Sequence, residues 1–315
     1  MPHTEPQAQI LTSVDDDRWL AVVGANPHAT FFHTPAWQRA VCASYPGWQP
    51  ATVLADWGDR RAVLPCIRTS RRRLLGLAGT ERLKSSVLGC YGGLVADGPL
   101  SADQCAALLS HAAAGRTRLQ LVTSPFDPWP EAGYPAGGST SATHCLELSG
   151  SPEAIPGLLN RGHRQAYNKA VRQGVTVRAG AWQTDRDTYV RLYHQTLARF
   201  QDAYIEVYPD RLLDSLFACG ADGVRLWLAE YQGAAVGGVI LLCHNRTACV
   251  WHVVSDADCF HLRFNQVLYV GMLQWAVAAG MTRFDFGPSG DNAGVAEFKR
   301  RFGARTLPFR SIRLP

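Results

Sequence analysis

The sequence predicts an α/β (α+β) fold of two domains, each with a mixed, largely antiparallel sheet flanked by helices. Three observations support this prediction. The chain has 315 residues, of which 47 % are apolar, and this can supply two sizeable cores. Three apolar strands follow one another closely between residues 224 and 254, with Gly233 and Asn245 in the connecting turns. Helical segments flank this run, and the first half of the chain has a shorter version of the same order.

The first domain is predicted to cover residues 1–150. Its elements, in order, are helices at Asp15–Ala25 and Pro35–Ser44, a hairpin of Ala51–Ala55 and Ala62–Arg68, a strand at Ser85–Gly93, a helix at Ala102–Ala114, and strands at Arg118–Thr123 and Thr143–Leu148. Thr34 can cap the second helix, and Pro35 can occupy the first position of that helix. The turn-rich residues 130–142 and the sequence Gly150-Ser151-Pro152 set the boundary.

The second domain is predicted to cover residues 151–306. It contains a basic helix and short strand within Arg161–Val175, helices at Asp185–Arg199 and Pro209–Cys219, strands at Val224–Tyr231, Ala235–Cys243 and Thr247–Val254, a helix at Phe264–Ala279, a strand at Phe284–Phe286 and a helix at Ala296–Arg301. Residues 307–315 are set apart from the second domain, because we expect a last strand, Thr306–Arg313, to return to the first domain.

Composition narrows the class of protein. No window of about 18 uncharged apolar residues exists, so no spanning helix is expected, and the amino terminus lacks a signal-peptide pattern. The nine cysteines include no C-x-x-C pair and indicate reduced core residues in a cytoplasmic protein. No metal-ligand cluster is evident, and we expect a monomer without a bound cofactor. The net charge of +5 permits an anionic partner without requiring one.

The most informative stretch runs from Phe284 to Gly303, FDFGPSGDNAGVAEFKRRFG. A short apolar strand ends at Gly287, a turn-rich loop follows, and a basic helix ends before Gly303. Ligand sites in α/β proteins commonly lie where a strand opens into such a loop and a helix. Taken alone, however, the pattern predicts an amphipathic helix with a solvated basic face.

This stretch resembles the carboxyl-terminal signature of the FemABX-like branch of the GNAT superfamily. The branch includes aminoacyl-tRNA-dependent ligases that add amino acids to peptidoglycan precursors, and its members end in an fDfG strand, a variable loop and an FK-x-x-F(G) helix. The basic helix that leads from Arg161 to Gly174-Val175 resembles a second element of the branch. The resemblance implies two fused GNAT-like domains, with the acceptor on the first and the donor on the second.

The implied chemistry is amide formation between an aminoacyl group from aminoacyl-tRNA and an amine. Such a reaction needs a deprotonated amine and a positive group near the developing oxyanion. From the resemblance, Lys299 would stabilise the oxyanion and touch the terminal adenosine of tRNA, and Phe298 would shape the pocket. Asp127, after a strand, or His252 would accept the proton, with a bound water as the alternative. For Asp127, a simple Asp-Pro turn remains the other interpretation.

Further residues are assigned to the two substrates. The predicted donor or tRNA contacts are Arg161, Arg164, Lys169, Arg172, Arg263, Arg300 and Arg301, and the predicted acceptor contacts are Trp37, Arg39, Tyr91, Gly92, Trp251 and Asp285. The pair Gly92-Gly93 indicates close backbone approach to a ligand or to a neighbouring strand. A further basic run, Arg71, Arg72, Arg73, Arg82 and Lys84, is interpreted as a solvated connection, with a phosphate-contacting patch as the alternative.

Two departures from the family pattern bear on the substrates. GNAT enzymes that use coenzyme A usually carry a glycine-rich pyrophosphate loop before the helix that follows the third strand. Here that place, Phe260 to Val267, contains no glycine, which favours aminoacyl-tRNA over acetyl-CoA. The residues with which Fem-type ligases hold a UDP-linked muropeptide are also unmatched near Val41, Val122 and Ala203–Val207, so the acceptor stays open among a peptide, an amino-sugar precursor and a small metabolite.

Two alternatives remain. One is an acyl-CoA-dependent N-acyltransferase that acts on an amine or amino sugar, and the other is a non-catalytic relative that only binds.

Overall fold

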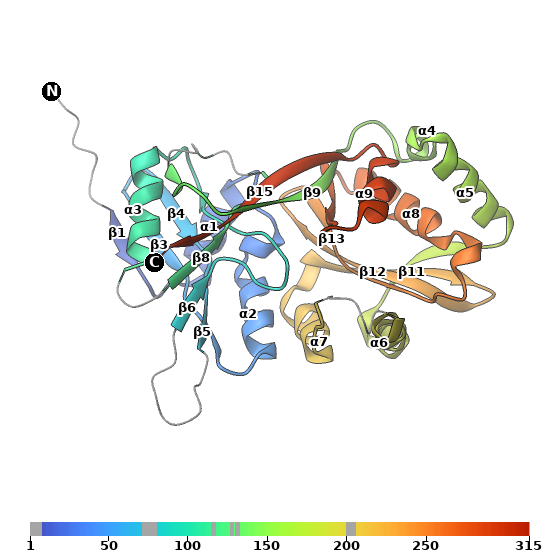
Figure 1. Ribbon diagram of the computed structural model, residues 1–315, viewed down its shortest axis with the longest axis horizontal. Coiled ribbons are helices and arrows are strands. Elements are labelled where there is room, and N and C mark those ends of the chain that lie inside the picture. Colours follow the sequence, from blue (N-terminus) through green and yellow to red (C-terminus); the bar gives the residue numbers. More distant parts are fainter. Residues whose placement is uncertain are drawn as a thin grey trace. The chain divides into compact units, whose positions relative to one another are not determined.

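A computed structural model describes residues 8–70, 81–114, 118–126, 129, 133–199 and 206–314 (Figure 1). The chain divides into two compact units. The first comprises Met1–Ser141, Arg211–Gly220 and Pro308–Pro315, and the second comprises Ala142–Asp210 and Ala221–Leu307. The boundary predicted at residue 150 is therefore too late, and a helix expected in the second domain groups with the first. Several residues named above, Arg71, Arg72, Arg73, Asp127 and Ala203, lie outside the described part of the chain.

The first unit contains two groups of strands. In one, β1 (Gln9–Leu11), β3 (Val53–Asp56), β4 (Arg61–Leu64) and β7 (Val95–Ala96) are antiparallel, in the order β1-β3-β4-β7. In the other, β2 (Trp48–Pro50), β5 (Ile67–Ser70), β6 (Glu81–Lys84), β8 (Arg118–Val122) and the end of β15 (Arg305–Leu314) follow in that spatial order. Only β6 and β8 run parallel within these described strands.

The first unit also contains helices, and those that precede β8 in the chain pack against these strands. The helices are α1 (Asp16–Ala25), α2 (Pro35–Ser44), α3 (Ala102–Ala112) and α7 (Asp210–Cys219), together with a 3-10 turn at Phe31–His33. Asp15, Thr34 and Ser101 cap the first three α-helices through their side-chain oxygens. One core joins α3 to both groups of strands, through Leu108, Leu64 and Leu119. A smaller core packs α1 on β3, β4 and β7.

The second unit has a sheet in the order β10-β11-β12-β13-β14-β9. The strands are β10 (Thr176–Gly180), β11 (Val224–Tyr231), β12 (Ala234–His244), β13 (Thr247–Ser255), β14 (Arg283–Pro288) and β9 (Ser139–Glu147). The helices are α4 (Ile155–Leu158), α5 (Arg161–Arg172), α6 (Trp182–Arg199), α8 (Phe264–Ala278) and α9 (Ala293–Arg300), with 3-10 turns at Pro152–Ala154, Ala221–Gly223 and Phe260–Leu262. β13 and β14 are parallel, and the other pairs in this described sheet are antiparallel.

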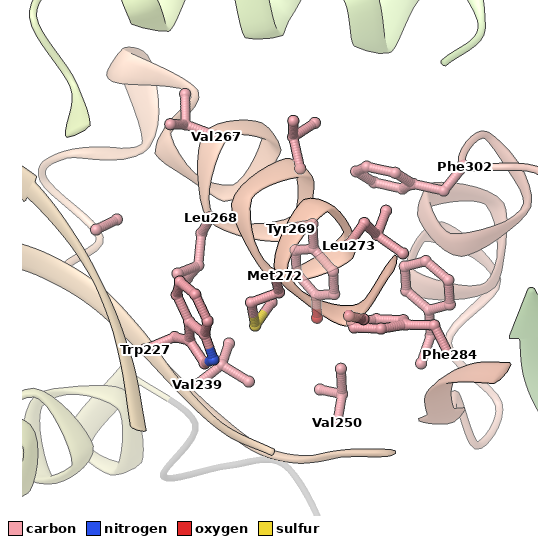
Figure 2. Packing of buried hydrophobic residues seen from close by; sticks show 14 of the residues in the cluster. Trp227, Val239, Val250, Val267, Leu268, Tyr269, Met272, Leu273, Phe284 and Phe302 are labelled. Atoms are coloured by element: carbon pink, nitrogen blue, oxygen red, sulfur yellow. The ribbon is translucent and has the colours of Figure 1, made fainter. Parts of the chain in front are cut away.

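Helix α8 packs at the centre of the second unit's core. Its apolar side chains, including Leu268 and Met272, lie over Trp227 and Val239 of the sheet, while Leu273 lies toward Phe302 (Figure 2). Helix α6 packs against β12 and β13 through Tyr189 and Tyr193. The predicted α/β fold with largely antiparallel sheets flanked by helices is confirmed. None of the helices in the described ranges is both long and apolar enough to cross a membrane.

Two local predictions in the first unit are wrong. The strand expected at Ala62–Arg68 is two strands, β4 and β5, because Pro65 cannot donate a ladder hydrogen bond between them. The strand expected at Ser85–Gly93 is irregular, and β6 instead ends at Lys84. This irregular segment turns back on itself, so that Gly92 lies directly against the main-chain oxygen of Ser85. A neighbouring backbone therefore accounts for Gly92.

Gly92→Ala should destabilise the protein, because the added Cβ would overlap a main-chain oxygen that cannot rotate away. Overpacking of this kind costs about 1–3 kcal/mol. Gly24→Ala is the matched control, since a Cβ at that position of α1 meets nothing within 4 Å and removes backbone freedom from the unfolded chain. Urea titrations of both variants test this pair. If Gly92→Ala has the same free energy of unfolding as wild type, the segment can move to accommodate the added Cβ.

Candidate active site

Two neighbouring parallel strands of the second unit, β13 and β14, stop pairing before either strand ends. The register joins residues 247–249 to residues 283–285 and goes no further. Beyond it, Gly287 has a φ of +76°, which favours glycine. A Cβ at Gly287 would also lie 2.9 Å from the main-chain oxygen of Val250. The glycine of the fDfG sequence therefore permits the turn at which the two strands separate.

A cavity of about 560 Å³ opens where the pairing ends. Its lining includes Val250, Trp251 and Val253 of β13, Phe286 of β14, and Phe298 and Lys299 of α9. The ends of α6 and α8 complete the wall. The cavity is large enough for an aminoacyl or acyl group with part of its carrier, and its lining is mostly apolar with a few polar groups, as is common in ligand sites.

The ammonium group of Lys299 is held at one end of this cavity. Its side chain is only 5 % exposed, and Nζ donates to the main-chain oxygens of Gly287 at 2.7 Å and Pro288 at 2.8 Å. Burial lowers the pKa of Lys299 to about 8, while the negative charge of Asp285 opposes that shift. An ammonium has three protons, so one N–H remains beyond the two hydrogen bonds to these carbonyls. The interpretation of this helix as having a solvated basic face is wrong at Lys299.

Asp285 is a fully buried brace for the same turn. Its carboxylate accepts hydrogen bonds from the Thr143 hydroxyl and from the main-chain N–H of Gly287, the latter at 2.9 Å. The thiol of Cys249 lies 3.6 Å from its other oxygen. With no exposed surface, Asp285 cannot contact an acceptor, so that prediction is wrong. Its carboxylate instead fixes the loop whose carbonyls hold Lys299.

His144 on β9 is a neighbour of Lys299 that the sequence analysis did not identify. The imidazole is buried, and Nδ1 lies 3.3 Å from the Ser289 hydroxyl. Burial is the main cause that lowers the pKa of His144, and the positive charges of Lys299 and Arg300 lower it further. A neutral imidazole therefore supports the loop after β14 without adding positive charge beside Lys299.

Aromatic rings form the wall next to Lys299. Tyr269 of α8 stacks on Phe286 with ring centroids 5.5 Å apart, and it meets Phe298 edge-on at 5.3 Å. Phe302, almost fully buried, packs behind Phe298 at 5.2 Å. On the β13 side, Trp251 lines the cavity and stacks on Tyr208 with centroids 5.1 Å apart. Phe298 and Trp251 thus both line the cavity that contains Lys299.

Arg199 provides a second cationic group of the cavity. Its guanidinium lies 4.9 Å from the centre of the Phe260 ring and donates to the Ser255 hydroxyl at 3.3 Å. Both contacts hold the charge against the cavity wall at the end of α6. The sequence offered no signal for this residue, because an arginine at a helix end is ordinarily solvated.

A basic groove of about 680 Å³ adjoins the cavity and shares Gly294 and Phe298 with it. Lys169 of α5, Arg263 at the start of α8, and Arg301 line the groove. Arg301 is paired with Glu297 at 3.0 Å, which reduces its charge toward a ligand. The main-chain oxygen of Phe298 lies 2.9 Å from Nε2 of His163, so α5 is tied to α9 across this groove.

The other predicted donor contacts lie elsewhere. Arg161, Arg164 and Arg172 are exposed on α5 and do not line the groove. Arg300 pairs with Glu297 on the surface at 2.9 Å. Of the seven cations predicted to contact the donor, Lys169, Arg263 and Arg301 therefore lie together in the basic groove.

His252 is not positioned as a general base. Its ring faces α6, with Nδ1 2.9 Å from the Tyr189 hydroxyl, and it is not part of the cavity lining. Burial lowers the pKa of His252 to about 3, so the imidazole is a neutral core group. His252 lies on the face of β13 opposite Trp251 and Val253, which line the cavity, so its ring points away from Lys299.

The acceptor contacts predicted in the first unit are also corrected. Trp37 is buried and meets Phe32 edge-on, and Tyr91 is buried among Phe32, Phe126 and Phe309. Arg39 is exposed and forms an ion pair with Asp16. Trp37 and Tyr91 are therefore core residues. Within the described ranges, no group of histidine, cysteine and acidic side chains could hold a metal ion.

Comparison with known proteins places this geometry in a class. Residues 160–300 match the family described as the acetyltransferase (GNAT) domain. No curated protein matches the sequence. Among solved structures, FemX is similar over 96 % of this chain and 96 % of that chain, with a TM-score of 0.71 and 11 % identity. A tandem GNAT protein from the clavulanic acid biosynthesis pathway covers 97 % of each chain, with a TM-score of 0.55 and 12 % identity.

A third similar structure is the C-terminal domain of a protein named as a lysylphosphatidylglycerol synthetase, from Agrobacterium fabrum. It covers 94 % of this chain and 90 % of that chain, with a TM-score of 0.58 and 14 % identity. The chain therefore shares its fold with FemX, and residues 160–300 match the acetyltransferase (GNAT) domain family.

The buried His252 should make stability depend on pH. The unfolded imidazole gains a proton below a pKa of about 6.5, whereas the folded one stays neutral until about pH 3, so stability falls as pH falls through this range. From pH 7.5 to pH 5 this group should remove about 2 kcal/mol of unfolding free energy. Urea titrations at both values should show the full loss in wild type and in the exposed-histidine control His111→Gln, and a clearly smaller loss in His252→Gln, in which the buried His144 and His163 remain. If His252→Gln loses as much unfolding free energy as wild type between the two pH values, other groups cause the loss.

Proposed function

We propose that this protein is an N-acyltransferase that forms an amide bond between an aminoacyl group, delivered by aminoacyl-tRNA, and an amine acceptor. The observation that carries the proposal is the Lys299 ammonium, which is buried at the end of the cavity and held by two main-chain oxygens. In the FemABX-like branch that the sequence resembles, the matching lysine belongs to the FK-x-x-F helix. FemX and the named lysylphosphatidylglycerol synthetase domain share the fold.

The geometry suits stabilisation of a developing oxyanion. When an amine attacks the aminoacyl ester, the carbonyl oxygen gains negative charge, and the third N–H of Lys299 can donate to it. The two carbonyls already fix the ammonium, so little reorganisation is needed during the reaction. The aromatic wall of Tyr269, Phe286 and Phe298 makes this end of the cavity apolar, and an interaction between charges is stronger in such surroundings.

The proton of the attacking amine needs another acceptor. His252 is excluded by its position, and Lys299 is the positive group, so a bound water is the base that fits the described residues. The nucleophile must also enter as a neutral amine. After attack, the C–N bond forms, the ester C–O bond breaks, and the 3′-oxygen of the tRNA leaves with a proton.

The basic groove favours a tRNA donor. It meets the cavity at Gly294 and Phe298, so an acyl group in the cavity would extend its phosphates toward Lys169 and Arg263. The sequence Phe260 to Val267 also lacks the glycines of a pyrophosphate loop. Such a donor would place the reaction in the cytoplasm. The acceptor is an amine of a peptide, an amino-sugar precursor or a small metabolite.

An acyl-CoA donor is the second candidate. The match of residues 160–300 to the acetyltransferase (GNAT) domain favours it, as does the similarity to a tandem GNAT protein. In this case the same cavity would hold the acyl group, and the groove would hold the carrier's phosphates.

The donor is tested by binding of charged tRNA and of acetyl-CoA at increasing salt. With tRNA as donor, affinity should fall steeply, because each phosphate contact releases condensed counterions, and Lys169→Ala should lower the salt slope by about one. Asp187→Ala, at an exposed position of α6, is a control for substitution alone. Amide product detected by mass should disappear after ribonuclease treatment. A tight complex with acetyl-CoA that is insensitive to salt would instead establish the second candidate.

Lys299→Ala should lower the single-turnover rate by about a hundred- to a thousandfold, with little change in acceptor affinity, because only the transition state loses the contact. Lys299→Met keeps the length of the side chain and should behave alike. Lys299→Arg should rescue little, since a planar guanidinium does not replace a compact ammonium. Arg300→Ala removes an exposed charge next to Lys299 and should leave the rate at saturating donor unchanged.

The pH profile separates this role from a structural one. The ammonium is the active form and its pKa is about 8, so the wild-type rate should fall as pH rises through 8. The residual rate of Lys299→Arg should not fall there, because arginine stays charged. Wild-type single-turnover rates in Lys299→Ala would exclude the proposed role.

A further inference from the structure

A separate charged pocket lies in the first unit, on strands β6, β8 and β15. It has a volume of about 300 Å³, and three arginines, Arg82, Arg118 and Arg313, line it together with Gln120 and parts of two leucines. All three arginines are exposed. Because the pocket lies on strands, the strand register fixes the backbone positions of the three arginines.

The register places the three charges side by side. Arg82 lies directly opposite Arg118 in the parallel pair of β6 and β8. Arg313 lies opposite Gln120 in the antiparallel pair of β15 and β8, which puts it diagonal to Arg118. Leu83 and Leu119, next along each strand, face the core, so the arginines share the opposite face.

Like charges at such positions repel one another and destabilise a sheet. In the described part of the chain, none of the three arginines forms an ion pair, and no acidic side chain lines the pocket. Glu81, the nearest acid along β6, points to the other face and lies 3.9 Å from Arg68. Lys84 also shares the arginine face, but its ammonium lies 5.8 Å from the centre of the Trp48 ring. The repulsion among the arginines is thus left uncompensated by described residues.

We propose that this pocket binds a terminal phosphate or diphosphate group. A guanidinium stays charged at every physiological pH and presents a planar fork of donors that matches phosphate oxygens. Gln120 adds an amide donor between two of the arginines. Their convergence on one small pocket fits a single highly charged group, whereas a nucleic-acid backbone carries one charge per phosphate and is contacted along a row. Arg82, one member of the basic run, therefore contributes to a phosphate site.

The chemistry is shared by two sources, a soluble phosphorylated molecule and a lipid with a terminal phosphate. Inorganic pyrophosphate serves as the soluble probe. Phosphatidylcholine vesicles with and without phosphatidic acid serve as the lipid probe. Flotation only with phosphatidic acid, prevented by pyrophosphate, identifies the lipid source. Pyrophosphate binding without flotation identifies the soluble source.

The test is calorimetric titration of the full chain with pyrophosphate at low salt. Wild type should bind saturably, and Arg118→Gln should weaken binding about tenfold or more, the loss typical of a charged hydrogen bond. Without pyrophosphate, Arg118→Gln should unfold at a higher urea concentration than wild type, because it relieves repulsion from Arg82 and Arg313. The control is Arg18→Gln, which removes an exposed, ion-paired arginine of the same unit and should leave the affinity unchanged.

Three results would overturn the proposal. One is absence of both pyrophosphate binding and vesicle flotation in wild type. Another is equal pyrophosphate affinity in the triple variant Arg82→Gln, Arg118→Gln, Arg313→Gln. The third is binding of single-stranded RNA that depends on these arginines without any binding of pyrophosphate, which would make the face a nucleic-acid surface.

Discussion

The separation of β13 from β14 is the constraint on which the second unit's chemistry depends. Two adjacent parallel strands that stop pairing leave main-chain groups that need partners. On β14, the turn at Gly287 directs two carbonyls toward Lys299, whose ammonium satisfies them. The same ammonium closes one end of the cavity. A positive charge is thus held inside the protein by the backbone that the open sheet exposes.

Burying this charge is costly, and the surrounding residues explain how it is tolerated. Burial lowers the pKa of Lys299 to about 8, yet the nearby charge of Asp285 favours the protonated form. Asp285 is itself satisfied by Thr143 and by the N–H of Gly287. Since a buried charge without partners would be strongly destabilising, the brace and the ammonium depend on each other. Their arrangement leaves one N–H of the lysine outside these hydrogen bonds.

The elements set by local pattern could be predicted, and the side-chain environments could not. The strand Val224–Tyr231 has the predicted bounds, because its apolar run lies between clear turns. Lys299 was identified through a motif, but its burial could not be predicted. The periodicity of a helix carries no information about the carbonyls of β14 that hold the ammonium. The predictions for Trp37 and His252 were wrong because tryptophan and histidine occur in protein cores as well as in ligand sites. Thr143 reaches Asp285 across 142 positions, a contact that no local pattern records.

The start of α8 shows how the chain replaces a glycine-rich loop. Arg263 occupies a left-handed conformation, with φ +59°, where the backbone would favour glycine. A non-glycine residue there costs about 1–2 kcal/mol. The residue that carries this conformational cost lines the groove beside Gln266 and Lys169. A glycine would relieve the strain and expose main-chain N–H groups to a pyrophosphate, whereas arginine supplies a side-chain contact to a phosphate. The strained position thus places a side-chain cation, not a glycine, on the wall of the groove.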